Sequence, residues 1–194
     1  MSKIAIAIAI LPPKDIIDAT LSVNKRAVEK GEAKIELGET DRIPHISLLM
    51  GVVDDKNFEE LTRKLKDIAE NFESIKMESN RIENGCFTIS KNEKLQNLHE
   101  MIVKKIDPIL THETSPKMFY ESSPSHVSDS ALRVVKEYVN NFSLKNFWPH
   151  ITIHSSEENP SELPLSFTAD RLAICHLGTY CTCRKILFET KLTK

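Results

Sequence analysis

The sequence predicts a single α+β domain with two lobes. Three observations support this fold class. Helix-like and strand-like segments are mixed along the 194 residues, no low-complexity segment or linker divides the chain, and one short motif occurs once in each half. A chain of this length can bury a sizeable core. We therefore expect one domain over residues 1–194, with lobes of about 1–92 and 93–194.

The first element is a short apolar segment, residues 4–11, in which Ile and Ala alternate. It is much shorter than the roughly 20 residues that a membrane span requires, and no small-residue cleavage site follows it. We interpret it as a buried strand. Its alanine face is thin and leaves room for a packed helix or for a ligand groove. The protein is expected to be cytoplasmic and to have no membrane partner.

The rest of the first half alternates between the two element types. Apolar residues at helical spacing predict helices, and short alternating runs predict strands. Gly31 is a stop signal for the first helix, and Asn84-Gly85 is a hairpin signal between the last two strands. The order after the first strand is helix, strand, strand, helix, strand and strand, over about residues 14–30, 34–37, 44–53, 56–73, 74–79 and 86–90.

The second half follows the same rules. Helices are predicted over about residues 93–110 and 129–141, with a long polar loop, rich in Ser and Pro, over 111–130. The second copy of the motif is a strand, and residues 155–164 form a loop. Strands over about 167–177 and 181–189 form a hairpin that turns at Gly178-Thr179.

The repeated motif is the most informative feature of the chain. Residues 43–48 read IPHISL, and residues 148–153 read WPHITI, so the two histidines are 105 positions apart (150 − 45). In a strand, residues i and i+2 point to the same face. His45 and Ser47 should therefore share one face of their strand, and His150 and Thr152 one face of theirs. The alternate residues, Ile46, Leu48, Ile151 and Ile153, should point the other way into a core.

Two histidines with pKa values near neutrality can act as a general base and a general acid in one reaction. In the hydrolysis of a cyclic phosphodiester, one imidazole takes a proton from the attacking water. The other gives a proton to the departing sugar oxygen on the opposite side of phosphorus. The hydroxyls of Ser47 and Thr152 would donate hydrogen bonds to phosphate oxygens and hold the phosphorus in line. This scheme requires no metal ion.

The paired motifs resemble those of the 2H phosphoesterase superfamily, which includes the RNA 2′,3′-cyclic phosphodiesterases also called 2′,5′-RNA ligases. The resemblance covers the whole chain in length and element order. It implies two similar lobes of antiparallel sheet flanked by helices, with the motifs facing each other across a central groove. It further implies that His45 and His150 are catalytic, with His150 activating water and His45 protonating the leaving oxygen. Ser47 and Thr152 would then be the phosphate ligands.

The sequence departs from the family pattern at two positions. Ser47 stands where threonine is more common, and it keeps the hydroxyl but lacks the methyl group that restricts the rotamer. Many RNA-processing members have an arginine three residues beyond the second threonine, where this chain has Ser155. Phe87 is a candidate for stacking on a nucleobase, although packing in the core is the more common fate of such a residue.

Other readings of these residues compete with catalysis. Either histidine of the motifs could simply be bonded to backbone in a half-buried position. A metal site would need His150 with His154 or His126, but strand geometry puts His154 about 13 Å from His150, and no carboxylate lies at ligand spacing. We therefore expect no metal ion and no cofactor. His99 and His112 are expected to be solvated or capping residues.

The four cysteines, Cys86, Cys175, Cys181 and Cys183, include no C-x-x-C pair. We expect reduced thiols, mostly buried in strands, in preference to a disulfide framework, a zinc site or a redox-active Cys181-x-Cys183 pair.

The net charge of −2 argues against a broad surface for duplex DNA, but it allows a local pocket for one phosphate. We expect a monomeric enzyme, a metal-independent phosphoesterase that hydrolyses a cyclic or 2′,5′-linked phosphodiester in a nucleotide or an RNA end. The alternative is a module of the same fold that binds a nucleotide, or anchors a partner, without turnover. The presence of both histidines and both hydroxyls favours the enzyme.

Overall fold

A computed structural model describes residues 2–157 and 160–193 of the chain. The elements run in the order β1 (Lys3–Leu11), α1 (Lys14–Glu29), β2 (Ile46–Asp54), α2 (Phe58–Glu70), β3 (Ile75–Glu83), β4 (Cys86–Ile89), α3 (Glu93–Ile106), α4 (Asp129–Phe142), β5 (His150–Thr152), β6 (Leu165–Ala169), β7 (Arg171–Leu177) and β8 (Cys183–Lys191). Short 3₁₀ turns lie at Asp55–Asn57, Asp107–Ile109, Pro116–Met118, Pro124–His126, Leu144–Asn146 and Thr179–Cys181.

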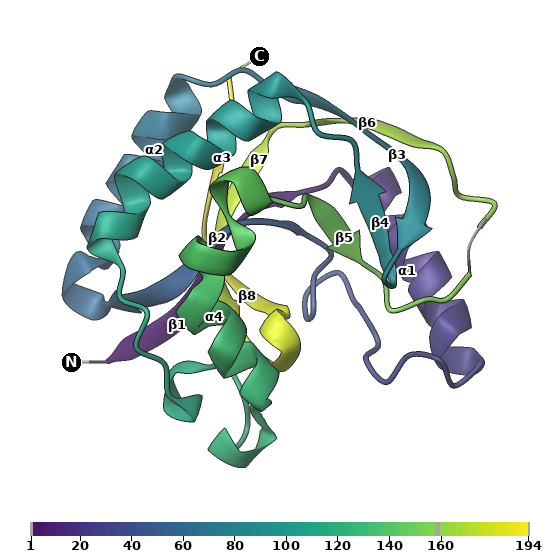
Figure 1. Cartoon of the computed structure of the whole chain (residues 1–194), viewed down its shortest axis with the longest axis horizontal. Coiled ribbons are helices and arrows are strands. Elements are labelled where there is room, and N and C mark those ends of the chain that lie inside the picture. The colour runs from purple at the N-terminus through teal and green to yellow at the C-terminus, as the bar shows by residue number, and fades with distance from the viewer. Residues whose placement is uncertain (1, 158–159, 194) are drawn as a thin grey trace.

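The strands form two antiparallel sheets of four strands each, ordered β2-β1-β7-β8 and β5-β4-β3-β6 (Figure 1). The α+β fold class and the antiparallel sheets are therefore confirmed. The proposed division into lobes near residue 92 does not follow the sheets, because each sheet takes two strands from each half of the chain. The two copies of the motif begin β2 and β5, which are edge strands of different sheets.

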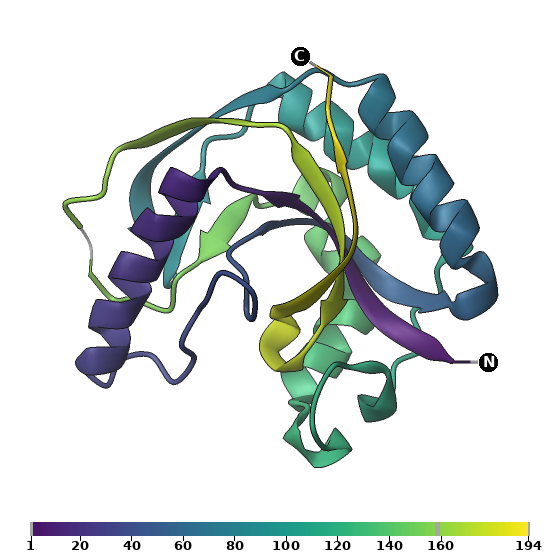
Figure 2. The same cartoon turned by 180° about the vertical axis from the view of Figure 1, so that it is seen from behind.

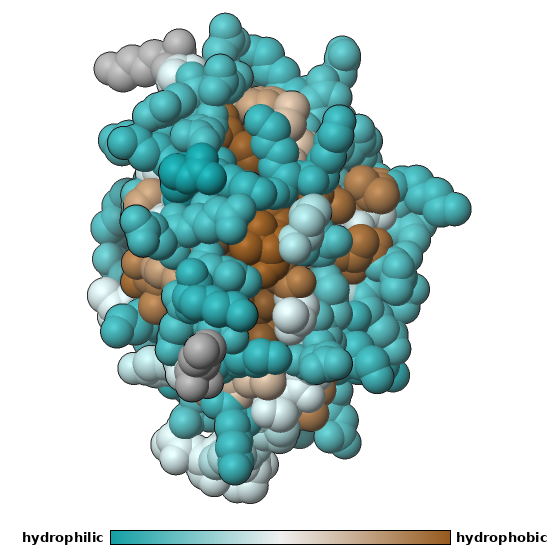
Figure 3. Space-filling view, turned by 90° about the vertical axis from the view of Figure 1, so that its left-hand side faces the viewer, coloured by the Kyte–Doolittle hydropathy of each residue, from teal (hydrophilic) through white to brown (hydrophobic). Residues whose placement is uncertain are grey.

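Helices cover the sheets on different sides. α2 and α3 pack against each other, with α2 against β7 and β8 and α3 against β2. α4 also contacts β2, and α1 lies on the opposite side of the molecule, beside β3, β4 and β5 (Figures 1 and 2). Figure 3 shows the side of the molecule on which α2 lies, at the left of Figure 1. Hydrophilic side chains dominate this surface, with a strip of apolar side chains at its middle. The apolar stripe of α2 itself faces inward, where Leu61, Leu65, Ile68 and Ala69 are buried.

One hydrophobic core joins the two sheets, and it contains Ile8 of β1, Ile46 of β2, Phe87 of β4 and Ile151 of β5. The Asn84-Gly85 hairpin is confirmed, and both residues have positive φ values, 52° and 73°, as a type I′ turn requires. The third helix ends at Ile106, earlier than expected, because Pro108 cannot continue it.

The predicted strand over residues 34–37 does not form, and the prediction was wrong. The Asn24 side chain of α1 takes the place of a strand partner. Its amide nitrogen donates to the carbonyl oxygen of Ile35 at 3.0 Å, and its oxygen accepts from the backbone N–H of Leu37 at 2.8 Å. The same amide donates to the Ile153 carbonyl at 3.0 Å and so ties α1 to the end of the second motif.

The loop expected over 155–164 contains no helix or strand among its described residues, while residues 158 and 159 lie outside the described part of the chain. Arg26 of α1 holds this loop through ion pairs with Glu157 at 3.2 Å and with Glu162 at 2.7 Å. The Arg26 hydrogen bond lowers the pKa of Glu162 to about 2. Among the described residues, none of the helices is long and apolar enough to cross a membrane.

Candidate active site

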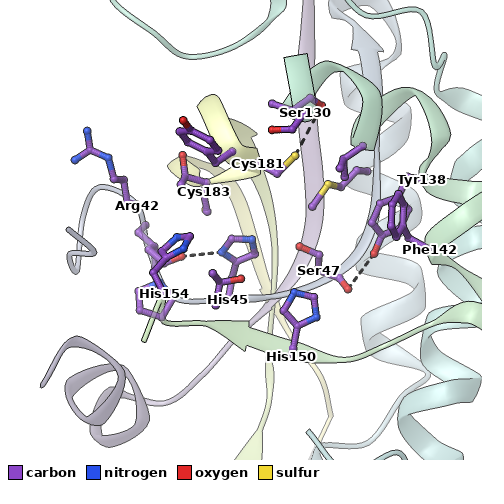
Figure 4. Close-up of a pocket in the computed structure, with 18 of the residues that line it drawn as sticks. Arg42, His45, Ser47, Ser130, Tyr138, Phe142, His150, His154, Cys181 and Cys183 are labelled. Atoms are coloured by element: carbon purple, nitrogen blue, oxygen red, sulfur yellow. Dashed lines mark hydrogen bonds between the residues drawn. The ribbon is translucent and has the colours of Figure 1, made fainter. Parts of the chain in front are cut away.

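The two motifs meet at a groove of about 310 Å³, since β2 of one sheet lies against β5 of the other (Figure 4). His45, Ser47, His150 and Thr152 all line this groove. Its other walls come from α4 and from the turn between β7 and β8. Four of the five predicted site residues are therefore brought together by segments more than 100 positions apart in the chain.

The first motif fixes the orientation of His45. Its Nδ1 lies 2.8 Å from the carbonyl oxygen of Ile43, two residues earlier. Because a carbonyl can only accept, Nδ1 carries the hydrogen, and in the neutral ring the Nε2 lone pair remains available. Ser47 follows on the same side, beside a register shift where Ala9 of β1 pairs with it. A shift of this kind bends a strand locally and re-aims its side chains.

The second motif repeats this geometry. Nδ1 of His150 lies 2.8 Å from the carbonyl oxygen of Trp148, again two residues earlier. The indole of Trp148 stacks on the imidazole with ring centroids 4.3 Å apart. The hydroxyl of Thr152 accepts a weak contact from Cys86 of β4, at 3.8 Å from sulfur to oxygen. Each imidazole thus uses one nitrogen to hold its position and keeps the other for chemistry.

Burial lowers the pKa of both imidazoles. For His45 the loss of solvent is the main cause, the hydrogen bond to Ile43 opposes it, and the charge of His150 lowers the pKa further. For His150 burial again lowers the pKa, and the bond to Trp148 opposes it. The charge effect of His150 on His45 reflects their proximity, and it means that the two groups do not titrate independently.

Phe87, the fifth predicted site residue, does not reach the groove, and its assignment as a substrate contact was wrong. Its side chain is 0% exposed and packs in the core. In β4, Cys86 and Thr88 pair with Thr152 and His150, while Phe87 pairs with Ile151 and shares its core-facing side. Strand alternation therefore directs Phe87 away from the substrate.

His154 also reaches the groove, although it lies beyond the end of β5. β5 ends at Thr152, and the carbonyl oxygen of Gly85 accepts from the backbone N–H groups of Ile153 at 3.0 Å and of His154 at 2.8 Å. His154 has a φ of 55° and lines the same groove as His150. Within residues 2–157 and 160–193, no three His, Cys, Asp or Glu side chains gather as a metal site would require.

His99 has a structural role that the sequence did not indicate, since it is 0% exposed rather than solvated. Its Nδ1 donates to the Leu48 carbonyl of β2 at 2.8 Å, and its Nε2 accepts from the Leu144 backbone N–H at 2.8 Å. The ring stacks on Phe147 at 3.9 Å. Burial lowers the pKa of His99 to about 4. This side chain therefore links the first motif strand to the segment that leads into the second.

His112 bonds to the Asp107 carboxylate at 2.8 Å and to the Val135 carbonyl in the middle of α4 at 3.1 Å, so it does not cap a helix end. All four cysteines are free thiols, and burial raises the pKa of Cys181 to about 12. Sequence reasoning missed Arg42, Tyr138, Trp148 and Tyr180 as groove residues. Trp148 and Arg42 could have been noticed, because both lie within three positions of a motif histidine.

No family model matches the sequence, and no curated protein matches it either. Solved structures match its fold. The protein TT0787 of Thermus thermophilus is 10% identical with a TM-score of 0.61, and the match covers 97% of this chain and 98% of that one. A crystal structure of a phosphoesterase is 13% identical with a TM-score of 0.53 and is covered over 100% of both chains.

E. coli LigT complexed with 3′-AMP is 13% identical, with a TM-score of 0.57 and coverage of 100% of both chains. At such low identities these comparisons establish the fold. The fold that the resemblance of the two motifs implied is therefore confirmed.

Proposed function

We propose that this protein is a phosphoesterase that hydrolyses a cyclic or 2′,5′-linked phosphodiester of a nucleotide or an RNA end, with His45 and His150 as its acid and base. The observation that carries the proposal is the matched pair of imidazoles. Each donates Nδ1–H to the carbonyl oxygen two residues earlier, at 2.8 Å, and each lines the groove. A protein that only bound phosphate would need no second proton-transfer group.

The proposed reaction forms one P–O bond and breaks another. One histidine, neutral at Nε2, takes a proton from water as its oxygen attacks phosphorus. The other histidine, protonated, gives its Nε2 proton to the departing ribose oxygen, so that the product is a phosphate monoester and a free hydroxyl. Ser47 and Thr152 donate hydrogen bonds to non-bridging oxygens, where negative charge accumulates. The chain's own side chains thus supply every proton transfer, and the proposed mechanism is independent of a metal ion.

The comparisons support this proposal. One of the matching structures is named a phosphoesterase, and structures of E. coli LigT are complexed with 3′-AMP and with phosphate. A nucleotide phosphate is therefore a ligand of a protein with this fold. The aromatic side chains of Tyr138 and Phe142 line one side of the groove, and the polar side chains of Arg42 and His154 line the other. This arrangement fits a ligand with a nucleobase and a charged phosphate.

The test is turnover of 2′,3′-cyclic AMP by the purified protein in the presence of EDTA, with 2′,5′-linked dinucleotides and RNA ends in a parallel panel. We expect a 2′- or 3′-monophosphate as the product, and none from a variant in which His45 and His150 are both replaced by Asn. Binding without product across the panel would indicate the non-catalytic alternative. Activity that EDTA abolishes and a divalent ion restores would reject the metal-independent mechanism.

A further inference from the structure

The groove has two chemically different ends on either side of the histidine pair. Tyr138 and Phe142 of α4 lie on one side of His45, and Arg42 and His154 lie on the other (Figure 4). Phe142 is 42% exposed, so its ring is available to a ligand. One end therefore suits an uncharged aromatic group, and the other suits an anion.

The backbone that lines the groove is strained at several positions. Six non-glycine residues among those described have φ values in the left-handed region, and four of these line the groove. They are Arg42 at 52°, His154 at 55°, Tyr180 at 56° and Cys181 at 58°. Such conformations cost free energy and cluster at ligand sites, where the surrounding structure holds side chains in place.

Separate contacts hold Arg42 and His154 in place. The residue after Arg42 pairs with β8, since the N–H of Ile43 donates to the Cys183 carbonyl at 2.9 Å. His154 is held by the Gly85 carbonyl, which accepts its backbone N–H at 2.8 Å. Neither of these contacts uses the side chain of Arg42 or His154, so backbone bonds bring both side chains to the same groove.

The charge of Arg42 is only partly neutralised. Its Nη1 lies 3.2 Å from Asp41, but Asp41 also pairs with Arg184, which in turn pairs with Glu121 at 2.8 Å. One carboxylate is thus shared by two guanidinium groups. Within the described ranges, Asp41 is the one acidic partner of Arg42, and its remaining N–H donors are open to a ligand.

His154 has no carboxylate partner within the described ranges, and burial lowers its pKa. An anion beside the ring would favour the protonated imidazolium, so binding of an anion there should take up a proton. The phosphate that reacts is already accounted for by His45, His150 and the two hydroxyls. An anion at Arg42 and His154 would be a different group of the same ligand.

We propose that Arg42 and His154 form a second phosphate site, so that the preferred ligand carries a further phosphate besides the one between His45 and His150. This inference rests on the proposed function for the identity of the first phosphate. In a 2′,3′-cyclic end, the further phosphate must lie on the 5′ side. It is either the 5′-phosphate of a mononucleotide or the linkage to the preceding nucleotide of an RNA, and both offer the same charged oxygens.

The test measures binding of product-like ligands by calorimetry at pH 6. Adenosine 3′-phosphate carries one phosphate, adenosine 3′,5′-bisphosphate adds the 5′-monoester, and the dinucleotide ApA with a 3′-phosphate adds an internucleotide diester. We expect the wild-type protein to bind at least one of the doubly charged ligands about ten-fold or more tightly than adenosine 3′-phosphate, as charge-assisted hydrogen bonds allow. The ligand that shows the gain identifies the source of the second phosphate.

The variants Arg42→Asn and His154→Asn remove the charge but suit the left-handed backbone, which asparagine tolerates. Each should reduce the ten-fold gain to under about three-fold. The matched control is Arg133→Gln, an exposed residue of α4 that does not line the groove, and it should keep the full gain. Thermal melting checks that each variant is folded.

Raising the pH from 5.5 to 8 should reduce the gain in affinity of the dinucleotide over adenosine 3′-phosphate. The added diester of the dinucleotide does not titrate in this range. His154→Asn should remove this pH dependence, since the imidazole is its source.

A gain below about two-fold in the wild-type protein, or a full gain in both asparagine variants, overturns the second phosphate site. Failure of the proposed function is a separate result. It would appear as absent turnover of 2′,3′-cyclic AMP while the binding gain and its loss in the variants remain. Turnover without any gain would instead leave the proposed function intact and remove this inference.

Discussion

The two histidine motifs have the same local geometry in unlike surroundings. β2 is a nine-residue strand, and β5 has three residues, yet in both motifs Nδ1 lies 2.8 Å from the carbonyl oxygen two positions earlier. In both, a proline stands between that carbonyl and the histidine. Proline restricts its own φ and keeps the preceding residue extended, so the motif itself presents the carbonyl.

The surroundings differ in what covers each ring. Trp148 precedes Pro149 and stacks on His150 at 4.3 Å, whereas Ile43 precedes Pro44 and offers His45 no aromatic ring. A tryptophan face stabilises an imidazolium more than a neutral imidazole. A local motif can therefore set the tautomer of both histidines, while their neighbours make the two chemically unequal.

The largest expected effect tests whether the two histidines act as a pair. His45→Ala and His150→Ala should each lower kcat by about 10²–10⁴, as the loss of a general acid or base does. The double variant should be little worse than either single variant, because the two groups work in one step. Steady-state kinetics on a cyclic nucleotide measure this. Near-normal turnover in one single variant would remove that residue from the mechanism.

The next effect distinguishes which of the two histidines is the general acid and which is the general base. If His45 is the acid, His45→Ala should recover a large part of its lost activity, up to about 10²-fold, on a diester with a nitrophenol leaving group, which needs little protonation. His150→Ala, Ser47→Ala and Thr152→Ala should lower turnover of both substrates. His150 activates the water, and the two hydroxyls bind phosphate oxygens, and both substrates need these contacts. Rates on the two substrates are compared for each variant. Rescue of His150→Ala instead would assign the base to His45.

The pH dependence should show the effect of burial on both rings. Each pKa lies below its ordinary value of 6.5, so the acid histidine loses its proton at a lower pH than a solvated one. We expect a bell-shaped profile of kcat/KM with a maximum below about pH 6.5 and a fall of about 10² by pH 9. Bound phosphate should move the kcat profile to higher pH. A rate that rises without a maximum up to pH 9 is incompatible with this pair.

His99 connects the two motif regions, and its effect should appear in stability. Its pKa is lowered to about 4 from 6.5, so the folded protein binds the proton less well than the unfolded chain. The stabilisation is fully present above pH 6.5 and is lost as the pH falls toward 4. It amounts to about 3 kcal/mol, at 1.36 kcal/mol for each pKa unit.

Urea unfolding of the wild-type protein and of His99→Gln at pH 7 and pH 4.5 measures this contribution. Glutamine can donate to Leu48 and accept from Leu144 but does not titrate. The free energy of unfolding of the variant should fall less on acidification. Glu162 also has a shifted pKa, but it is present in both proteins and contributes equally to both losses. Equal losses of unfolding free energy would therefore show that His99 is not the acid-sensitive group.

The smallest expected effect concerns the difference between the motifs directly. Trp148→Leu should lower kcat by about two- to ten-fold, the value of one stacking contact, while Trp148→Phe should retain most of the activity. The same assay with both variants measures it. Unchanged turnover in Trp148→Leu would mean that the stacked ring contributes nothing to the chemistry.

Placements that depend on local pattern were predicted correctly. Alternation located β1 and β2, the Asn84-Gly85 pair located the turn between β3 and β4, and spacing placed Ser47 and Thr152 beside the histidines. Residues whose role depends on a distant partner were not. The segment over 34–37 is held by Asn24 instead of a sheet, and Phe87 pairs with Ile151 of β5 and shares its core-facing side.

His154 and Arg42 show the same limit at the site. His154 reaches the groove because the chain turns where the Gly85 carbonyl accepts two N–H groups, and neither the turn nor that acceptor follows from strand spacing. Arg42 is brought to the groove by the bridge between Ile43 and Cys183, which are 140 positions apart (183 − 43). No local pattern encodes a contact of that length.

The sequence by itself determined most of the elements, the two motifs and the orientation of each imidazole, because these depend on backbone dihedral preferences and on contacts within two residues. Only the tertiary structure decided that each sheet takes strands from both halves and that β2 and β5 lie against each other. Strand pairing and packing join segments far apart in the chain. Their free energy depends on the whole core, so they cannot be read from any one segment.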